Sequence, residues 1–323
     1  MQSRRFGHTG LEVSEIGHGL WGMGGWSGSD DRESLRALQL SLDLGCNLFD
    51  TAWAYGNGRS DGLLGQLIAA NPGRRIIAAS KVPPKNRKWP ASAVDKVRDV
   101  FPRDYVFQTA EQIRKALGTE AIDVLQLHVW HDVWAVDESW IRTVEDLKRE
   151  GLIRWFGISL NRWESANGIA AIRTGAVDAV QVIYNVFEQA PEDALFPVCR
   201  ELDVGVIARV PLDEGSLGGT LTRDTRFPPD DWRSSYFGPE NLGPTVERVE
   251  RLKKLVPAGM TLPEMALRFV LESPDVHTTI VGMRKERHVR TNVAVSDGVR
   301  LPPALVQALC GERWDRKVER WSD

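Results

Sequence analysis

The sequence predicts an α/β fold, namely a (β/α)8 TIM barrel preceded by an N-terminal β-hairpin. Short apolar runs alternate with longer amphipathic segments, and eight of the runs qualify as strands. This alternation is typical of a parallel sheet covered by helices. A doubly wound sheet is the competing architecture, but GMGG at Gly22–Gly25 lacks the G-x-G-x-x-G spacing of its dinucleotide-binding turn. Because no linker divides the chain, we expect residues 1–323 to form a single barrel domain.

The elements before the second strand follow from turn and capping signals. Segment Arg5–Ile16 carries the turn signal HTG between two apolar stretches, which predicts the hairpin. Leucines recur at helical spacing over Arg32–Leu44, which predicts a helix. Ser29 or Asp30 can cap the N-terminus of this helix, and Gly45 can end it.

The remaining elements follow the same alternation. The predicted strands are His18–Trp21, the run ending at Asp50, IIAASK ending at Lys81, IDVLQLH ending at His128, Ile153–Ser159, Ala179–Ile183, Val204–Val210 and Thr278–Val281. Further helices are expected at Asp104–Leu117, Glu138–Glu150, Trp163–Arg173 and Glu192–Glu201. Two segments rich in Pro and Gly, 82–103 and 211–244, are expected to form lids over the mouth of the barrel.

Composition excludes several classes of partner. The net charge of −3, with both signs interspersed, gives no electrostatic footprint for nucleic acid or for an anionic membrane, so small molecules are the expected partners. Three cysteines without metal-ligand spacing favour a reducing compartment, and we expect no metal site. No run of apolar residues is long enough for a membrane span, and no signal peptide is recognisable, so we expect a cytoplasmic protein.

Four ionisable groups stand at or just after the ends of predicted strands: Asp50, Tyr55, Lys81 and His128. In a parallel barrel these strand ends meet at one face. Asp50 would hold the Lys81 ammonium, and that ammonium would lower the pKa of Tyr55 from its ordinary value near ~10 and make the phenol a proton donor. A neutral His128 could donate a hydrogen bond to a carbonyl oxygen. The natural reaction of such a site is carbonyl reduction with hydride from a cofactor.

The segments that carry these groups resemble signatures of the aldo-keto reductase family. GCNLFDTAWAYGNGRSDGLLG resembles the family's first signature, with Asp61 where glutamate is more usual, and IIAASKV and IDVLQLH resemble the lysine and histidine strands. The resemblance implies the barrel fold, a catalytic tetrad at Asp50, Tyr55, Lys81 and His128, and a nicotinamide dinucleotide, usually NADPH, bound without a Rossmann domain.

The same resemblance implies a site for the nicotinamide ring. Ser159 and Gln181 match the residues that the family uses on the carboxamide. Leu160 stands where an asparagine is usual, and Asn161 is the candidate to replace that asparagine. Arg209 stands where an aromatic residue usually stacks on the ring. Its guanidinium could stack there, although its charge would disfavour the oxidised ring, or it could turn away and meet an acidic group of the substrate.

The phosphate groups of the cofactor have expected partners further along the chain. The segment Leu212–Leu217, with Gly215, resembles the loop that wraps the pyrophosphate. The sequence TTIVGMRKERHVRTN resembles the 2′-phosphate site at the start of a helix, where a helix N-terminus and basic residues favour an anion. The expected contacts there are Gly282, Arg284, Lys285, His288 and Asn292. These residues favour NADPH over NADH.

Three tryptophans are candidates for walls of a substrate pocket, namely Trp53, Trp89 and Trp130, because they lie in or beside predicted mouth loops. The leading hypothesis is an NADPH-dependent reductase of aldehydes or ketones. One alternative is an aldolase or lyase that forms a Schiff base on Lys81. The other is a non-catalytic regulatory subunit that senses NADPH, as is known among relatives of this family that associate with channels.

Overall fold

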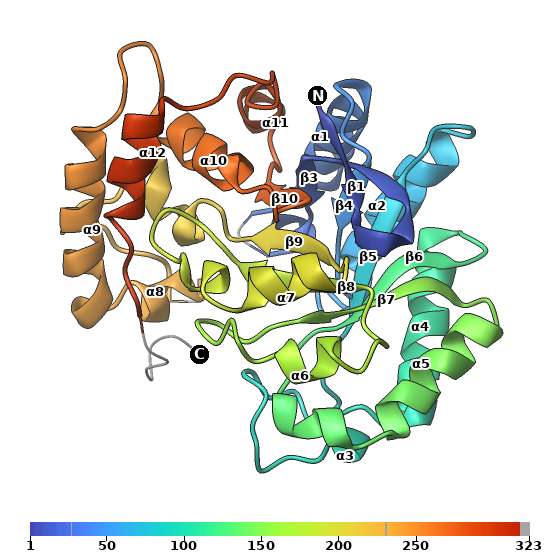
Figure 1. Cartoon of the computed structure of the whole chain (residues 1–323). Helices are drawn as coiled ribbons and strands as arrows, with labels where there is room; N and C mark the ends of the chain where they lie inside the picture. The colour runs from blue at the N-terminus through green and yellow to red at the C-terminus, as the bar shows by residue number, and fades with distance from the viewer. Residues whose placement is uncertain (27, 230, 317–323) are drawn as a thin grey trace.

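The computed structural model describes residues 1–26, 28–229 and 231–316 and shows a closed barrel of parallel strands surrounded by helices (Figure 1). The strand order around the barrel is β10-β3-β4-β5-β6-β7-β8-β9. The barrel strands are β3 (Ile16–Gly19), β4 (Leu48–Asp50), β5 (Ile77–Val82), β6 (Ile122–Leu127), β7 (Ile153–Ser159), β8 (Ala179–Ile183), β9 (Gly205–Arg209) and β10 (Thr278–Gly282). The predicted fold class is confirmed.

The predicted hairpin is also present and closes the bottom of the barrel. Strands β1 (Ser3–Phe6) and β2 (Leu11–Ser14) pair antiparallel and are joined by a 3-10 turn over Gly7–Thr9. Phe6 packs with the inward-facing residues of the barrel. Gly205 leaves room for that ring, since a Cβ at this position would lie 2.7 Å from atoms of Phe6.

Alternation along the strands divides the barrel interior into an apolar floor and a polar rim. Side chains of successive strand residues point to opposite faces, so residues two apart share the interior. The apolar cluster of the floor contains Leu48, Ala79, Val124, Ala179 and Ile207. Two residues further along their strands stand, in turn, Asp50, Lys81, Gln126, Gln181 and Arg209. The strand register therefore gathers these polar side chains at one end of the barrel.

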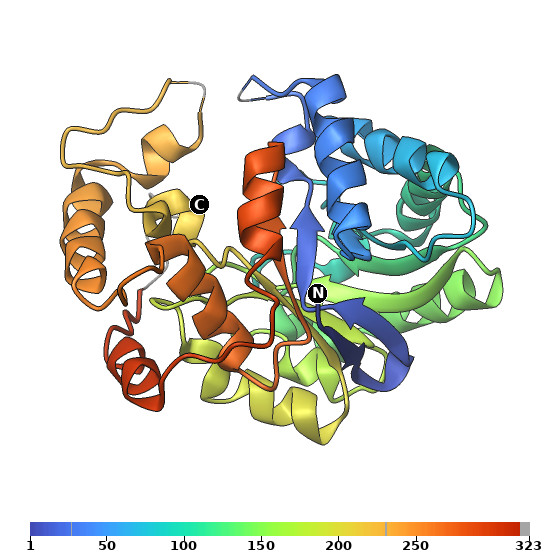
Figure 2. The same ribbon diagram turned by 90° about the horizontal axis from the view of Figure 1, so that it is seen from above.

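Helices cover the outer face of the barrel. They are α1 (Asp31–Asp43), α2 (Arg59–Ala70), α3 (Val97–Val100), α4 (Arg103–Leu117), α5 (Ser139–Arg149), α6 (Ile169–Ile172), α7 (Leu195–Glu201), α8 (Arg233–Tyr236), α9 (Pro239–Lys253), α10 (Leu262–Glu272), α11 (Glu286–Val293) and α12 (Pro303–Cys310). Asp30 caps α1, since its Oδ1 accepts a hydrogen bond from the Glu33 amide at 2.7 Å. In Figures 1 and 2, α9 and α12 lie on the opposite side of the molecule from α4 and α5.

Several predicted boundaries differ from the structure. The first barrel strand begins at Ile16 and not at His18, because its register with β10 starts there, and Trp21 already opens a 3-10 turn. The helix expected at Trp163–Arg173 shrinks to α6, since Trp163 has a positive φ of 56°. The helix expected from Glu192 begins at Leu195.

The two segments expected to be lids are partly helical. The first contains α3, and the second contains the 3-10 turn Asp213–Gly218 and helix α8. The predicted second segment, 211–244, extends too far toward the C-terminus, because α9 begins at Pro239 and contains Pro244. Within the described ranges, no helix is long and apolar enough to cross a membrane.

Candidate active site

The rim of the barrel brings the four predicted catalytic side chains together. Asp50 ends β4 and accepts a hydrogen bond on Oδ1 from Lys81 Nζ at 2.5 Å. Lys81 also donates to the carbonyl of Thr51 at 2.8 Å, and Nζ lies 5.3 Å from the centroid of the Tyr55 ring. That ring contacts His128 edge to face, with centroids 5.7 Å apart. The structure thus brings a carboxylate, an ammonium, a phenol and an imidazole together at one site.

Tyr55 is positioned by the loop between β4 and α2. Gly58 allows this loop to turn, because it has a φ of 87° and a Cβ there would lie 2.4 Å from the ring of Trp53. The start of α2 is then fixed to the barrel, since the Ser80 hydroxyl of β5 donates to Asp61 Oδ1 at 2.6 Å. Burial raises the pKa of Asp61 to about 7. Asp61 thus supports the loop that carries Tyr55.

The charge state of Tyr55 and Lys81 differs in one respect from the sequence-based expectation. Burial raises the pKa of Tyr55 above its ordinary value, and the opposing effect of Lys81 only reduces this rise. The expected lowering of the pKa of Tyr55 is therefore not the net result. Burial lowers the pKa of Lys81, but Asp50 and Tyr55 together raise it above its ordinary value. At neutral pH the site holds a protonated phenol beside an ammonium.

His128 is a neutral imidazole. Burial, followed by Lys81 and Arg209, lowers its pKa well below 6.5. Its ring also contacts Trp89, with centroids 5.8 Å apart and the planes nearly perpendicular. A neutral imidazole in this position can donate a hydrogen bond without adding charge to the site.

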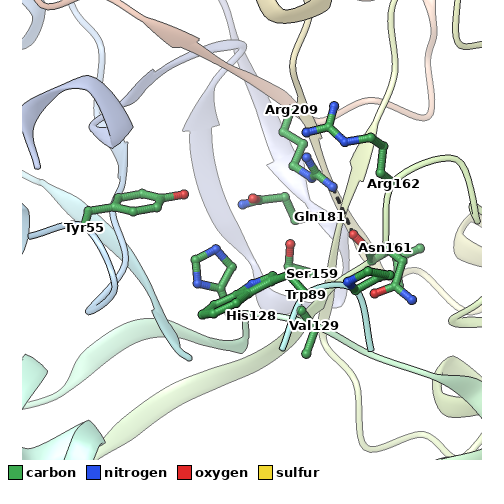
Figure 3. Close-up of a pocket in the computed structure, with 11 residues that line it drawn as sticks. Tyr55, Trp89, His128, Val129, Ser159, Asn161, Arg162, Gln181 and Arg209 are labelled. Atoms are coloured by element: carbon green, nitrogen blue, oxygen red, sulfur yellow. Dashed lines mark hydrogen bonds between the residues drawn. The ribbon is translucent and has the colours of Figure 1, made fainter. Parts of the chain in front are cut away.

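These groups face a cavity of about 180 Å³ at the mouth of the barrel (Figure 3). Its polar lining consists of Tyr55, His128, Ser159, Asn161, Arg162, Gln181 and Arg209. Its remaining walls are Trp89, Pro90, Val129 and Leu160. The cavity thus combines apolar walls with a few convergent polar groups, as small-molecule sites do.

The second oxygen of Asp50 links the lysine to two glutamines of the barrel strands. Asp50 Oδ2 accepts hydrogen bonds from Gln181 Nε2 at 2.8 Å and from Gln126 Nε2 at 3.4 Å. Asp50 therefore orients Gln181 as well as Lys81. Gln126 was not among the predicted site residues, although its position two residues before His128 on the inner face of β6 is a usable signal.

Asn161 lines the cavity, and its side-chain amide hydrogen-bonds to Ala91 and Glu164. Its Oδ1 accepts from the Ala91 amide at 3.0 Å, and its Nδ2 donates to the Ala91 carbonyl at 3.1 Å and to Glu164 Oε2 at 2.6 Å. Asn161 therefore holds the loop after β5 against the loop after β7. Its predicted contact with a carboxamide stays a prediction, and that contact would compete with these three hydrogen bonds.

Arg209 and Arg162 stand together at one side of the cavity (Figure 3). Arg209 Nη2 donates to the carbonyl of Leu160 at 3.0 Å. Arg162 Nη1 forms an ion pair with Glu214 Oε1 at 2.7 Å, and its guanidinium lies 5.3 Å from the ring centroid of Trp232. Arg162 was not predicted from the sequence, because its partner lies 52 residues away and no local pattern connects the two.

Of the three candidate wall tryptophans, the structure places one in the cavity. Trp89 lines it and is 42% exposed. Trp130 is fully buried, where it packs against Trp134 and Trp140 at centroid distances of 5.7 Å and 5.0 Å. Trp53 packs against the hydrophobic core beside Gly58. Trp130 is therefore a packing residue, and the expectation that it contacts the substrate is corrected. Trp53 is partly buried and does not line this cavity, and its contact with a substrate stays a prediction.

The residues expected at the phosphate groups lie on two elements. Leu212, Gly215 and Leu217 belong to the turn that follows β9, in which Glu214 and Gly215 have positive φ angles of 54° and 100°. Gly282, Arg284, Lys285, His288 and Asn292 lie at the end of β10 and on α11, with Lys285 as the N-cap residue. Burial, followed by Arg287 and Lys285, lowers the pKa of His288. The start of α11 is thus a basic helix terminus.

Comparison with known proteins identifies the family. The model of the Aldo/keto reductase family matches residues 15–309. The chain belongs to the aldo-keto reductase family. It is 28% identical over 295 residues to aldo-keto reductase YhdN of Bacillus subtilis, covering 88% of this chain and 86% of that protein. It is also 28% identical over 312 residues to the NADH-specific methylglyoxal reductase of Escherichia coli, covering 91% and 93%.

A solved structure agrees with this assignment. The glycerol dehydrogenase AKR11B4 of Gluconobacter oxydans superposes with a TM-score of 0.79 at 26% identity, covering 99% of this aldo-keto reductase and 98% of that chain. Membership makes the chain an oxidoreductase that uses a nicotinamide cofactor on small carbonyl compounds.

Proposed function

We propose that this aldo-keto reductase reduces an aldehyde or ketone to an alcohol with NADPH and that Tyr55 supplies the proton. The observation that carries the proposal is that Tyr55 lines the cavity next to a buried ion pair: the Lys81 ammonium lies 5.3 Å from the phenol ring centroid and is bonded to Asp50. A proton donor must be protonated before the reaction. The raised pKa of Tyr55 meets that condition at neutral pH.

Lys81 acts on Tyr55 through its charge. Its ammonium is held by Asp50 and by the carbonyl of Thr51, so it cannot turn away when the phenol loses its proton. A fixed cation beside a developing phenolate stabilises that anion more in a cavity than in water. His128, which is neutral, donates a hydrogen bond to the carbonyl oxygen and holds it close to the Tyr55 hydroxyl.

The residues at the mouth fit a nicotinamide dinucleotide. Gln181 is oriented by Asp50, and Ser159 lines the same cavity, so both can hold the carboxamide, while Asn161 is left out of this set. When bound, the cofactor supplies the hydride. Leu212, Gly215 and Leu217 form the loop for the pyrophosphate. Arg284 and Lys285, at the start of α11, favour the additional phosphate of NADPH.

The alternative chemistry on Lys81 has no support from its surroundings. A Schiff base requires a neutral amine that can attack a carbonyl. The Lys81 amine is instead ion-paired at 2.5 Å, and its pKa is raised by Asp50 and Tyr55 against the effect of burial. We therefore retain carbonyl reduction as the proposed reaction.

The substitution Tyr55→Phe tests the role of the phenol. We expect purified protein to oxidise NADPH in the presence of simple aldehydes, and we expect the variant to lose about 10²–10⁴-fold in kcat, the usual contribution of a general acid. Binding of NADPH, measured by fluorescence titration, should be retained. Measuring NADH in parallel tests the cofactor preference.

Two outcomes would contradict the proposal. Equal turnover by the Tyr55→Phe variant would remove Tyr55 from the reaction. Tight binding of NADPH by the unsubstituted protein without turnover of any carbonyl compound would favour the regulatory-subunit alternative.

A further inference from the structure

Arg209 presents a cation to the cavity without a counter-ion. Its Nη2 donates to the carbonyl of Leu160 at 3.0 Å, and its buried Nε has no hydrogen-bond partner among the described residues. In the part of the chain that the structure describes, no carboxylate forms an ion pair with Arg209, and none lines the cavity. The guanidinium is therefore solvated only in part and is not neutralised.

The other charges at the mouth are paired. Lys81 is matched by Asp50, and Arg162 is matched by Glu214. Tyr55 is protonated and His128 is neutral, so neither supplies a negative charge. Among these cations, Arg209 is thus the one without an ion-pair partner in the described residues, and the charge of Glu214, which is bound to Arg162, offsets only part of the effect of burial on its pKa.

A buried cation without an ion-pair partner is unfavourable unless a ligand pairs with it and accepts its hydrogen bonds. Burial, followed by repulsion from Arg162, lowers the pKa of Arg209 to about 10, so the guanidinium is still charged at neutral pH. Its planar donor fork matches the two oxygens of a carboxylate. In Figure 3, Tyr55 and Arg209 enter the cavity from opposite sides, with Gln181 between them.

We propose that Arg209 binds an anionic group of the substrate and that the preferred substrates are aldehydes or ketones that also carry a carboxylate. The carbonyl oxygen would meet Tyr55, and the carboxylate would meet Arg209. This inference rests on the proposed carbonyl reduction. The same guanidinium could bind a phosphate of the cofactor instead, and the experiment below separates these two sources of negative charge.

The kinetic test uses pairs of substrates that differ only in charge. Each pair consists of an aldehyde with a free carboxylate, such as 4-oxobutanoate or 4-carboxybenzaldehyde, and its methyl ester. We expect kcat/KM to favour at least one acid over its ester by about tenfold to a hundredfold, the range for a charge-assisted hydrogen bond. This ratio should fall to about one in Arg209→Met, because the cation that binds the carboxylate is gone. Part of the ratio should return in Arg209→Lys, which keeps the charge.

A binding test does not depend on turnover. For each pair, the alcohol that corresponds to the acid and the alcohol that corresponds to the ester are titrated into the protein by calorimetry, once with NADP⁺ present and once without it. We expect the acid to bind more tightly to the unsubstituted protein and to lose this advantage in Arg209→Met. NADPH affinity of the same variant is measured as the control.

The outcomes are distinct. The inference would be overturned if the acid and the ester of every pair had equal kcat/KM values. It would also be overturned if the preference for an acid remained in Arg209→Met. A large loss of NADPH affinity with an unchanged acid-to-ester ratio would also overturn it, and it would assign Arg209 to the cofactor. If no carbonyl compound is turned over, the proposed reaction fails while the titration still decides whether Arg209 binds a carboxylate.

Discussion

The ion pair between Asp213 and Arg316 connects the C-terminal segment to the loop that we assign to the cofactor. The two side chains are only 1% and 2% exposed, and Arg316 Nη2 donates to Asp213 Oδ1 at 2.6 Å. Arg316 also donates to the Tyr236 hydroxyl at 3.0 Å, and its guanidinium lies 4.8 Å and 4.9 Å from the ring centroids of Trp163 and Trp314. We predict that Arg316→Met destabilises the protein, because it leaves the Asp213 carboxylate buried without its cation.

The expected size of this effect follows from the burial of the pair. Removing one partner of a buried ion pair costs about 3–5 kcal/mol. The Ser216 hydroxyl still donates to Asp213 Oδ2 at 2.7 Å, so we expect the lower end of that range. The unfolding entropy of about 2.1 cal/mol/K per residue amounts to about 0.7 kcal/mol/K over the 323 residues, so a loss of about 3 kcal/mol lowers the melting temperature by roughly 4–5 °C. NADPH affinity should fall as well, because Asp213 and Glu214 hold unfavourable positive φ angles of 44° and 54° beside the proposed pyrophosphate loop.

The matched control is Arg313→Met, three residues earlier in the same segment. Arg313 pairs with Asp193 and Asp315 but is 31% exposed, so its loss should cost about 0–1 kcal/mol. Thermal unfolding followed by circular dichroism and NADPH titration by fluorescence measure both variants. Equal losses of stability in the two variants would refute the reasoning about burial. A destabilised Arg316→Met with unchanged NADPH affinity would show that the pair does not hold the loop.

Two further predictions concern packing and acid stability. In α2, a Cβ on Gly65 would lie 2.1 Å from the carbonyl of Ala116 in α4, so Gly65→Ala should lower the unfolding free energy, measured in urea, by about 1–3 kcal/mol. A Cβ on Gly62 would have no atom within 4 Å, so Gly62→Ala should raise the unfolding free energy by up to about 1 kcal/mol. An unchanged stability of Gly65→Ala would contradict the close approach of the two helices. Burial lowers the pKa of His18 to about 3. Below about pH 6.5 this histidine is therefore protonated in the unfolded chain but still neutral in the folded protein, so the unfolding free energy falls as the pH drops from about 6.5 toward 3. Between pH 7.5 and 5 this contribution is about 2 kcal/mol, and His18→Leu should remove it from the urea unfolding curves; an unchanged pH dependence in the variant would exclude His18 as the cause.

The fold was predictable because it depends on patterns that recur along the chain. Each barrel strand is an apolar run with a polar residue or a glycine near its end, and the period of two assigns Asp50, Lys81 and Gln181 to the interior without knowledge of their neighbours. The tetrad was predictable for the same reason, since the carboxyl ends of parallel strands meet at one rim. Trp163 shows the limit of periodicity, because helical spacing of apolar residues cannot reveal a positive φ.

The partners of individual side chains were not predictable in this way. Asn161 and Ala91 lie 70 residues apart, and Asp213 and Arg316 lie 103 apart, so only the folded chain decides that they meet. The direction in which the pKa of Tyr55 is shifted was not predictable either, because it also depends on the folded surroundings. The sequence identifies Lys81 as a neighbouring charge but does not give the depth of the cavity, and burial is the larger effect.

The two acidic residues that follow Arg209 explain why this arginine has no counter-ion. Asp213 and Glu214 are its nearest carboxylates along the chain after β9, yet Asp213 is bound to Arg316 and Glu214 is bound to Arg162. Both are held in left-handed backbone conformations. Glu214 raises the pKa of Arg209 through its charge, but its hydrogen-bonded ion pair is with Arg162. The ion pairs that shape the proposed cofactor loop are thus the ones that leave a positive charge in the cavity. A substrate carboxylate would neutralise that charge without disturbing the loop.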